Sequence, residues 1–184
     1  MLRATTAAEH RALEEKLEIA RPDADDGAYA RYLGAVLGWL EPLESVLWAG
    51  LWPETIVPAV RADKVRWIES DLRARGFTER DLAAIPRQTA LPNSSTVAHR
   101  FGIAYVVEGS LLGGQSLLRS LGPRLKHSAR WLEGYGRETV PRWRAFLAAL
   151  ETSVATRRDA EIAAENARAT FTWIADWFAL RGVG

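Results

Sequence analysis

The segment FGIAYVVEGSLLGGQ (residues 101–115) is the most informative part of this sequence. It is apolar almost throughout and shows no alternation of period two, which predicts a long, buried helix over residues 96–121 that ends at Gly122-Pro123. Four glycines lie inside it, although each costs a helix about 1 kcal/mol relative to alanine. Helical spacing aligns Gly102, Gly109 and Gly113 on one face. That face either packs closely against another helix or receives a flat ligand, and the pair Gly113-Gly114 favours a kink.

The rest of the chain is also helical in pattern. Pro42 either kinks or breaks the second helix, Gly76 is placed to cap the third, and Thr78 is placed to begin the fourth. Residues 88–95 read as a loop. With no strand, repeat or linker, the sequence predicts one all-α domain over residues 1–184. The helices expected besides 96–121 span residues 3–20, 27–50, 60–75, 78–84, 127–135, 138–153 and 157–181.

Composition excludes several classes of protein. The chain has 184 residues, of which 48% are hydrophobic and 26% charged, so it can bury a core. Lys and Arg number 24 and Asp and Glu 23, a balance that argues against a nucleic-acid partner. No apolar run reaches the roughly 18 residues of a membrane span, and the polar N-terminus does not resemble a signal peptide, so we expect a cytoplasmic protein.

Metal chemistry is limited to a few side chains. The chain has no Cys, and its single Met is Met1, so thiolate, iron–sulfur and Met-ligated sites are excluded. A bound metal must therefore use His, Asp, Glu or Tyr, and the histidines are His10, His99 and His127.

His10 is the first candidate ligand. Helical spacing places it on one stripe with Thr6, Leu13 and Leu17, so we expect it to face the interior. Glu14 follows at i+4, within reach of the imidazole. A histidine whose second nitrogen is held by a carboxylate is typical of a metal ligand, but a core histidine with a satisfied hydrogen bond gives the same pattern. Taken with the glycine-bearing helix, the pair suggests a planar metal cofactor between two helices, and haem fits that description.

At these residues the sequence resembles the biliverdin-producing haem oxygenases, particularly the bacterial branch. The resemblance extends over essentially the whole chain, in the family's order. It rests on Leu2-Arg3-Ala4-Thr5-(x4)-His10-(x3)-Glu14, on residues 104–114 (AYVVEGSLLGG), on Trp143-Arg144-(x)-Phe146-Leu147-(x2)-Leu150, and on Ala169-Thr170-Phe171.

The resemblance implies a haem between a proximal N-terminal helix and a kinked, glycine-rich distal helix. His10 would be the iron ligand and Glu14 its hydrogen-bond partner. Ser110 stands where the animal enzymes carry a distal aspartate. The remaining implied contacts are Gly109, Gly113 and Gly114 on the distal face, Arg3, Tyr105 and Arg144 at the propionates, and Phe171 against the porphyrin.

The activity implied is cleavage of haem b, as substrate and cofactor, by O2 and electrons to biliverdin, CO and iron as Fe²⁺. The sequence has no flavin or nicotinamide fingerprint, so an external reductase or ferredoxin would supply the electrons. Biliverdin would serve iron acquisition or a bilin-binding photoreceptor, and no membrane or nucleic acid is expected as partner. The main alternative is a haem-binding or haem-trafficking protein without turnover. A thiaminase-like or di-iron relative and a helical adaptor are further alternatives, although no histidine here has the Glu-x-x-His spacing of di-iron sites.

Overall fold

The computed structural model describes residues 2–184; Met1, the first residue of the predicted domain, lies outside the described residues. The described chain is helical and has no strand, which confirms the all-α prediction. The α-helices are α1 (Leu2–Thr5), α2 (Ala7–Lys16), α3 (Asp26–Ala49), α4 (Lys64–Ala74), α5 (Glu79–Ala84), α6 (Val97–Leu121), α7 (Arg130–Glu133), α8 (Thr139–Ser153) and α9 (Arg157–Leu180). Short 3₁₀ turns are η1 (Glu18–Ala20), η2 (Pro58–Val60), η3 (Gly122–Arg124) and η4 (Gly136–Glu138).

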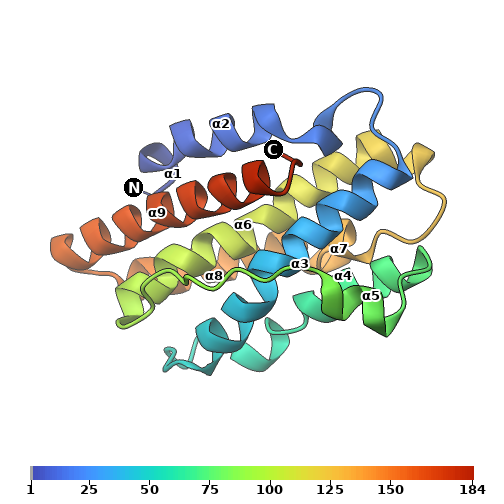
Figure 1. Cartoon of the computed structure of the whole chain (residues 1–184). Helices are drawn as coiled ribbons and strands as arrows, with labels where there is room; N and C mark the ends of the chain where they lie inside the picture. Colours follow the sequence, from blue (N-terminus) through green and yellow to red (C-terminus); the bar gives the residue numbers. More distant parts are fainter. Residues whose placement is uncertain (1) are drawn as a thin grey trace.

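The predicted central helix is α6, and it runs unbroken through Gly113 and Gly114. The side chain of Thr96 caps its first turn by accepting a hydrogen bond from the backbone N–H of His99. The helix packs against α7, α8 and α9. Figure 1 shows α6 in the middle of the molecule, with α9 lying alongside it and α1 and α2 on the outer side of α9.

α6 and α9 approach closely at Gly102. A Cβ atom on Gly102 would lie 2.5 Å from the carbonyl oxygen of Ala163 and 3.1 Å from the nitrogen of Ala167, both in the α9 backbone. At this position the glycine therefore serves helix packing, the first of the two interpretations of the glycine face.

The second, third and fourth predicted helices are present, with shifted ends. α3 begins at an Asp25 cap and continues through Pro42 without a break. α4 starts four residues later than expected, since residues 58–60 form η2. Gly76 follows α4 with φ +88°, and Thr78 begins α5 with a capping box, both as predicted.

The helix predicted over residues 127–135 is wrong in length, because α7 spans only Arg130–Glu133. The cause is Asp71, a fully buried carboxylate on α4. It accepts hydrogen bonds from the backbone N–H groups of Arg130 and Trp131 at 2.8 and 2.9 Å, and from the hydroxyls of Tyr29 and Ser128. Because Asp71 accepts hydrogen bonds from the first N–H groups of α7, this helix starts at Arg130 rather than at residue 127.

The single helix predicted over residues 3–20 is also wrong. It is interrupted at Thr6, whose hydroxyl donates back to the Leu2 carbonyl at 2.9 Å, and again at Leu17, which has an extended backbone. Leu2, Thr6, Leu17 and Ile19 are buried, whereas none of the residues of α2 is. α2 is therefore held mainly by the segments at its two ends.

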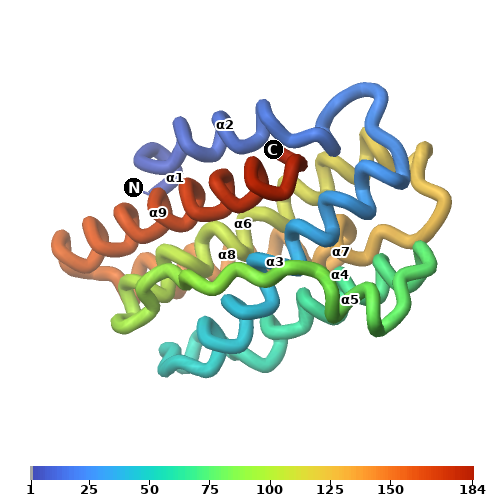
Figure 2. The backbone as a smooth tube through the Cα atoms, viewed as in Figure 1, coloured from blue at the N-terminus to red at the C-terminus, as the bar shows by residue number. Residues whose placement is uncertain are grey.

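α2 lies along α9, as the backbone trace in Figure 2 shows. The Arg168 side chain on α9 donates from Nε to Oε1 of Glu9 at 2.7 Å. The described residues form no helix with the length and apolarity needed to cross a membrane.

We expect Gly102→Ala to destabilise the fold by about 1–3 kcal/mol, because the added methyl group meets the α9 backbone rather than a flexible side chain. The control is Gly34→Ala within α3, where the nearest atom lies 4.0 Å away and alanine should stabilise by about 0.5–1 kcal/mol. Urea unfolding of the two variants measures both effects. Equal stability of the two variants would contradict the close contact at Gly102.

We also expect the docking of α2 to depend on pH. The hydrogen bond from Arg168 lowers the pKa of Glu9 from its usual 4.5. A carboxyl group with a lowered pKa in the folded state stabilises above its usual pKa, and that contribution is lost as the pH falls through the lowered value. Hydrogen exchange over residues 7–16, corrected for intrinsic rates, should therefore quicken below about pH 4.5. Glu9→Gln should exchange faster at neutral pH and lose this part of the pH dependence, and identical profiles would contradict the role of the pair.

Candidate functional site

The structure brings four of the predicted site residues together where α2, α6 and α9 meet. His10 and Glu14 lie one turn apart on α2, and Nδ1 of His10 is 3.2 Å from Oε2 of Glu14. The imidazole lies edge-on to the ring of Phe171 on α9, with ring centroids 5.6 Å apart. Glu14 also faces α6, because its Oε1 is 3.8 Å from the place of a Cβ on Gly113.

The expectation that His10 faces the interior is wrong. Its side chain is 49% exposed and that of Glu14 is 54% exposed. The interruption at Thr6 explains this, because α2 is a separate helix and does not continue the buried stripe that begins at Leu2 and Thr6. The imidazole of His10 lies at the outer edge of the contact between α2 and α9. Of the two rings in contact, that of Phe171 is buried and that of His10 is not.

A second group of residues lies one turn along α6. The indole of Trp143 on α8 comes within 3.5 Å of the Cβ place of Gly109, and its ring centroid is 5.2 Å from that of Tyr105. These distances are ordinary contacts, so neither Gly109 nor Gly113 is required by backbone packing as Gly102 is. Trp143 belongs to one of the motifs of the sequence, but its position beside the glycine face does not follow from that motif.

Ser110 and Gly114 are placed differently from the other α6 candidates. The Ser110 hydroxyl is half-buried and donates to the Val107 carbonyl of its own helix at 2.8 Å. Gly114 lies against α7, where a Cβ would be 3.3 Å from the carbonyl oxygen of Leu132. The structure therefore separates Gly114 from Gly109 and Gly113.

The two predicted propionate-binding arginines lie on the surface. Arg3 on α1 and Arg144 on α8 are exposed, and neither forms a hydrogen bond or an ion pair with another of residues 2–184. They are therefore free to contact an anionic group from outside the fold. Nothing in the structure brings them into contact with His10.

Sequence reasoning missed a buried ion cluster on the other side of α6. Glu108 is 3% exposed, and its carboxylate contacts the guanidinium of Arg61, the ammonium of Lys64 at 2.8 Å and the hydroxyl of Tyr135 at 3.2 Å. The sequence does contain an indication of this cluster, because Glu108 is the only charged residue within the apolar run 101–115. Lys64 gives a second indication, because helical spacing places it on one stripe with the buried Ile68 and Leu72.

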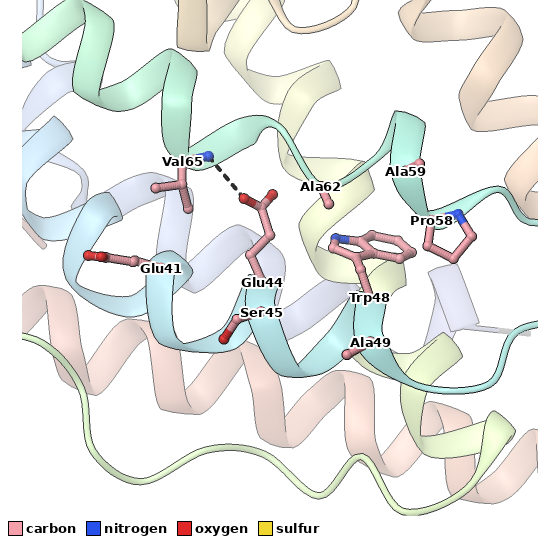
Figure 3. A pocket seen from close by; sticks show the side chains of 9 residues that line it. All are labelled: Glu41, Glu44, Ser45, Trp48, Ala49, Pro58, Ala59, Ala62 and Val65. Atoms are coloured by element: carbon pink, nitrogen blue, oxygen red, sulfur yellow. Dashed lines mark hydrogen bonds between the residues drawn. The ribbon is translucent and has the colours of Figure 1, made fainter.

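A surface hollow of about 440 Å³ lies apart from the His10 group, between α3 and the segment that leads into α4 (Figure 3). None of the predicted site residues lines it. The described residues also contain no cluster of three or more His, Cys, Asp or Glu side chains that would hold a bare metal ion.

The residues at the α2–α6–α9 junction fit a haem group in their chemistry. Glu14 lies against Nδ1 of His10, so Nε2 is the nitrogen left for an iron atom, the arrangement usual for metal-binding histidines. Gly109 and Gly113 present backbone without Cβ atoms on the facing helix. His99 is less suited, since both its ring nitrogens contact Thr96 and Asn93.

Comparison with known proteins agrees with this chemistry. The family model described as "Heme oxygenase" matches residues 1–179. A curated "Heme oxygenase" of Xanthomonas campestris pv. campestris (strain 8004) is 37% identical over an alignment of 114 residues, and the match covers 59% of this chain and 64% of that protein. The match thus spans somewhat less than two thirds of the relative's length. With the family model covering almost all of the sequence, the chain belongs to the haem oxygenase family.

Proposed function

We propose that this protein is a haem oxygenase that cleaves haem b to biliverdin, CO and Fe²⁺, and that residues 1–184 act as one domain. The observation that carries the proposal is the His10–Glu14 pair on α2, facing the glycines of α6 in a chain that belongs to this family. When bound, haem supplies both the substrate and the iron at which O2 is activated.

The role of His10 is to hold the iron from the α2 side. Glu14 contacts Nδ1 and so keeps that nitrogen protonated, which leaves the lone pair of Nε2 for the metal. The edge contact with Phe171 restricts rotation of the imidazole. Phe171 and Glu14 together thus orient His10.

The role of α6 is to form a distal wall with little bulk. Gly109 and Gly113 leave space for O2 beside the porphyrin, and Trp143 with Tyr105 closes the side next to Gly109. The Ser110 hydroxyl donates to its own helix, so its oxygen is left to accept a hydrogen bond from water. In this way Ser110 can orient a water molecule without acting as a base.

Local cations compensate for the small net charge of the protein. Haem carries two propionates, whereas the formal charge of the chain is only +1. Arg3 and Arg144 are exposed and unpaired among the described residues, so their guanidinium groups remain available to carboxylates. The hydroxyl of Tyr105 would add a neutral hydrogen-bond donor for the propionates. Gly114 lies against α7 and has no direct part in binding them.

Haem entry requires α2 to move outward. The side chain of Glu14 lies directly over Gly113, in the space that the macrocycle would occupy. No residue of α2 is fully buried and only Leu13 of this helix packs, partly buried, against the core, so the helix can shift with a small loss of core contact. The extended backbone at Leu17 and the interruption at Thr6 provide the two hinges.

The partners proposed are haem, O2 and an external electron donor, either a reductase or a ferredoxin. Delivery of biliverdin to a bilin-binding photoreceptor remains one use of the product, and iron acquisition is the other. Haem titration of the purified protein, followed by reduction under air and identification of the bilin, tests the function. A stable haem complex that yields no bilin would instead indicate the haem-binding or trafficking alternative.

We expect His10→Ala to weaken haem binding and to change the absorption spectra of the ferric and the ferrous–CO forms. The variant removes the imidazole that lies at the α2–α6–α9 junction, the one histidine ring there among residues 2–184. The matched control is His127→Ala, because His127 is also exposed but lies outside this junction. If the spectra change with His127→Ala and not with His10→Ala, the proximal assignment is wrong.

We expect Gly113→Leu to retain haem but to lose most bilin formation, because the new side chain would fill the space for O2. Overpacking typically costs about 1–3 kcal/mol, which corresponds to roughly a 5- to 150-fold loss of rate. Ser120→Leu adds a leucine at an exposed position of the same helix and should leave turnover unchanged. Normal bilin yield from Gly113→Leu would show that haem lies elsewhere.

A further inference from the structure

The buried ion cluster joins α6 to three other parts of the fold at the level of the distal glycines. Glu108 directly precedes Gly109, and its carboxylate is 2% exposed. Arg61 lies between η2 and α4, and Lys64 is the first residue of α4. Tyr135, between α7 and η4, completes the set of groups around Glu108.

The cations of the cluster are themselves held in place. The Lys64 ammonium also donates to the backbone carbonyl of Arg61. Glu44 on α3 accepts hydrogen bonds from the backbone N–H groups of Lys64 and Val65, each at 3.1 Å, and so caps the start of α4 (Figure 3 shows the bond to Val65). Glu108 therefore contacts a fixed constellation of charges rather than flexible side chains.

Stability alone is a weak reason for such a cluster. Burying charges costs solvation energy, and apolar side chains of the same volume are often as stabilising. Ionic contacts differ from apolar ones in that they hold only in one geometry. The cluster is therefore better suited to fixing the position of α6 than to increasing the stability of the fold.

The glycine face next to Glu108 leaves the rotation of α6 about its axis poorly constrained. Side chains that interlock with neighbouring helices normally fix the rotation of a helix. On the face of Gly109 and Gly113 no side chain is present to interlock, and the nearest atoms lie 3.5 and 3.8 Å from the Cβ places. Glu108 lies about 100° around the helix from Gly109, so a fixed Glu108 fixes the direction of the glycines.

The cluster also touches the wall around Gly109. The guanidinium carbon of Arg61 lies 5.7 Å from the ring centroid of Phe146. Phe146 in turn stacks on Trp143, with centroids 5.6 Å apart and planes inclined by 20°. A shift of Arg61 would thus reach the aromatic side chain that lies on Gly109.

We propose that Glu108 is a positioning residue of the haem site: through Arg61 and Lys64 it sets the rotation of α6 and so the place of Gly109, Gly113 and Trp143 relative to the substrate. The inference rests on the proposed function, because the substrate is haem. It predicts that the cluster controls which meso carbon faces the reacting oxygen, in addition to its contribution to folding.

The test compares Glu108→Gln with Asp71→Asn. Asp71 is an equally buried carboxylate, but it binds α7 and the chain before it rather than the glycine face of α6. Tyr135→Phe is a milder variant that removes the hydroxyl next to Glu108 and leaves both ion pairs of Glu108 in place, and it serves if Glu108→Gln does not fold.

The first measurement is hydrogen exchange of the protein without haem. Glu108→Gln should quicken exchange over residues 105–113 by about tenfold relative to residues 163–171 of α9, a factor equal to about 1.4 kcal/mol. Asp71→Asn should instead quicken exchange over residues 128–133. Uniform acceleration by both variants would mean a purely structural role and would overturn the proposal.

The second measurement is the ratio of biliverdin isomers from the haem-loaded protein. This ratio does not depend on how much protein is folded, so loss of stability alone leaves it unchanged. We expect a changed ratio with Glu108→Gln and the wild-type ratio with Asp71→Asn. An unchanged ratio with Glu108→Gln would overturn the inference. Absence of biliverdin from the wild type would refute the proposed function, and the exchange experiment would still decide whether Glu108 holds α6.

Discussion

The close approach of α6 and α9 at Gly102 is the contact on which the rest of the structure depends. A Cβ there would lie only 2.5 Å from an α9 carbonyl oxygen, so the two backbones run as near to each other as a glycine permits. α7 and α8 pack on α6, and α1 and α2 lie on α9. The pair thus forms the frame that brings the proximal segment to the glycine face.

The glycines of α6 show how one sequence pattern serves different purposes. Gly102 meets α9 backbone and Gly114 meets α7 backbone, whereas Gly109 and Gly113 meet only side chains at ordinary contact distance. Helix packing therefore accounts for the first two and leaves the second two unexplained by the fold. That division supports a ligand on one part of the face, because a glycine whose Cβ would meet no backbone atom costs helix stability although the fold would tolerate alanine there.

The two sides of α6 near Gly109 have opposite character. One side presents the two glycines Gly109 and Gly113, and the other carries a carboxylate surrounded by Arg61, Lys64 and Tyr135. α2, across from the glycines, has no buried residue and is held mainly through its ends. A fixed α6 and a loosely held α2 suit the proposed haem site, which has to accept a large planar substrate and then hold it in one orientation.

The sequence by itself determined the helical class, the cap at Thr78, the span of α6, the pairing of His10 with Glu14 and the family, since each follows from local periodicity or from a short motif. Only the tertiary structure decided that His10 is exposed, that α7 begins at Arg130 and that Gly114 faces away from Gly113. The exposure of His10 depends on the interruption at Thr6, and the start of α7 on Asp71, which lies 59 residues earlier in the chain. The ion cluster around Glu108 likewise joins residues 47 positions apart. Such contacts form between segments that the fold alone brings together, so no local pattern records them.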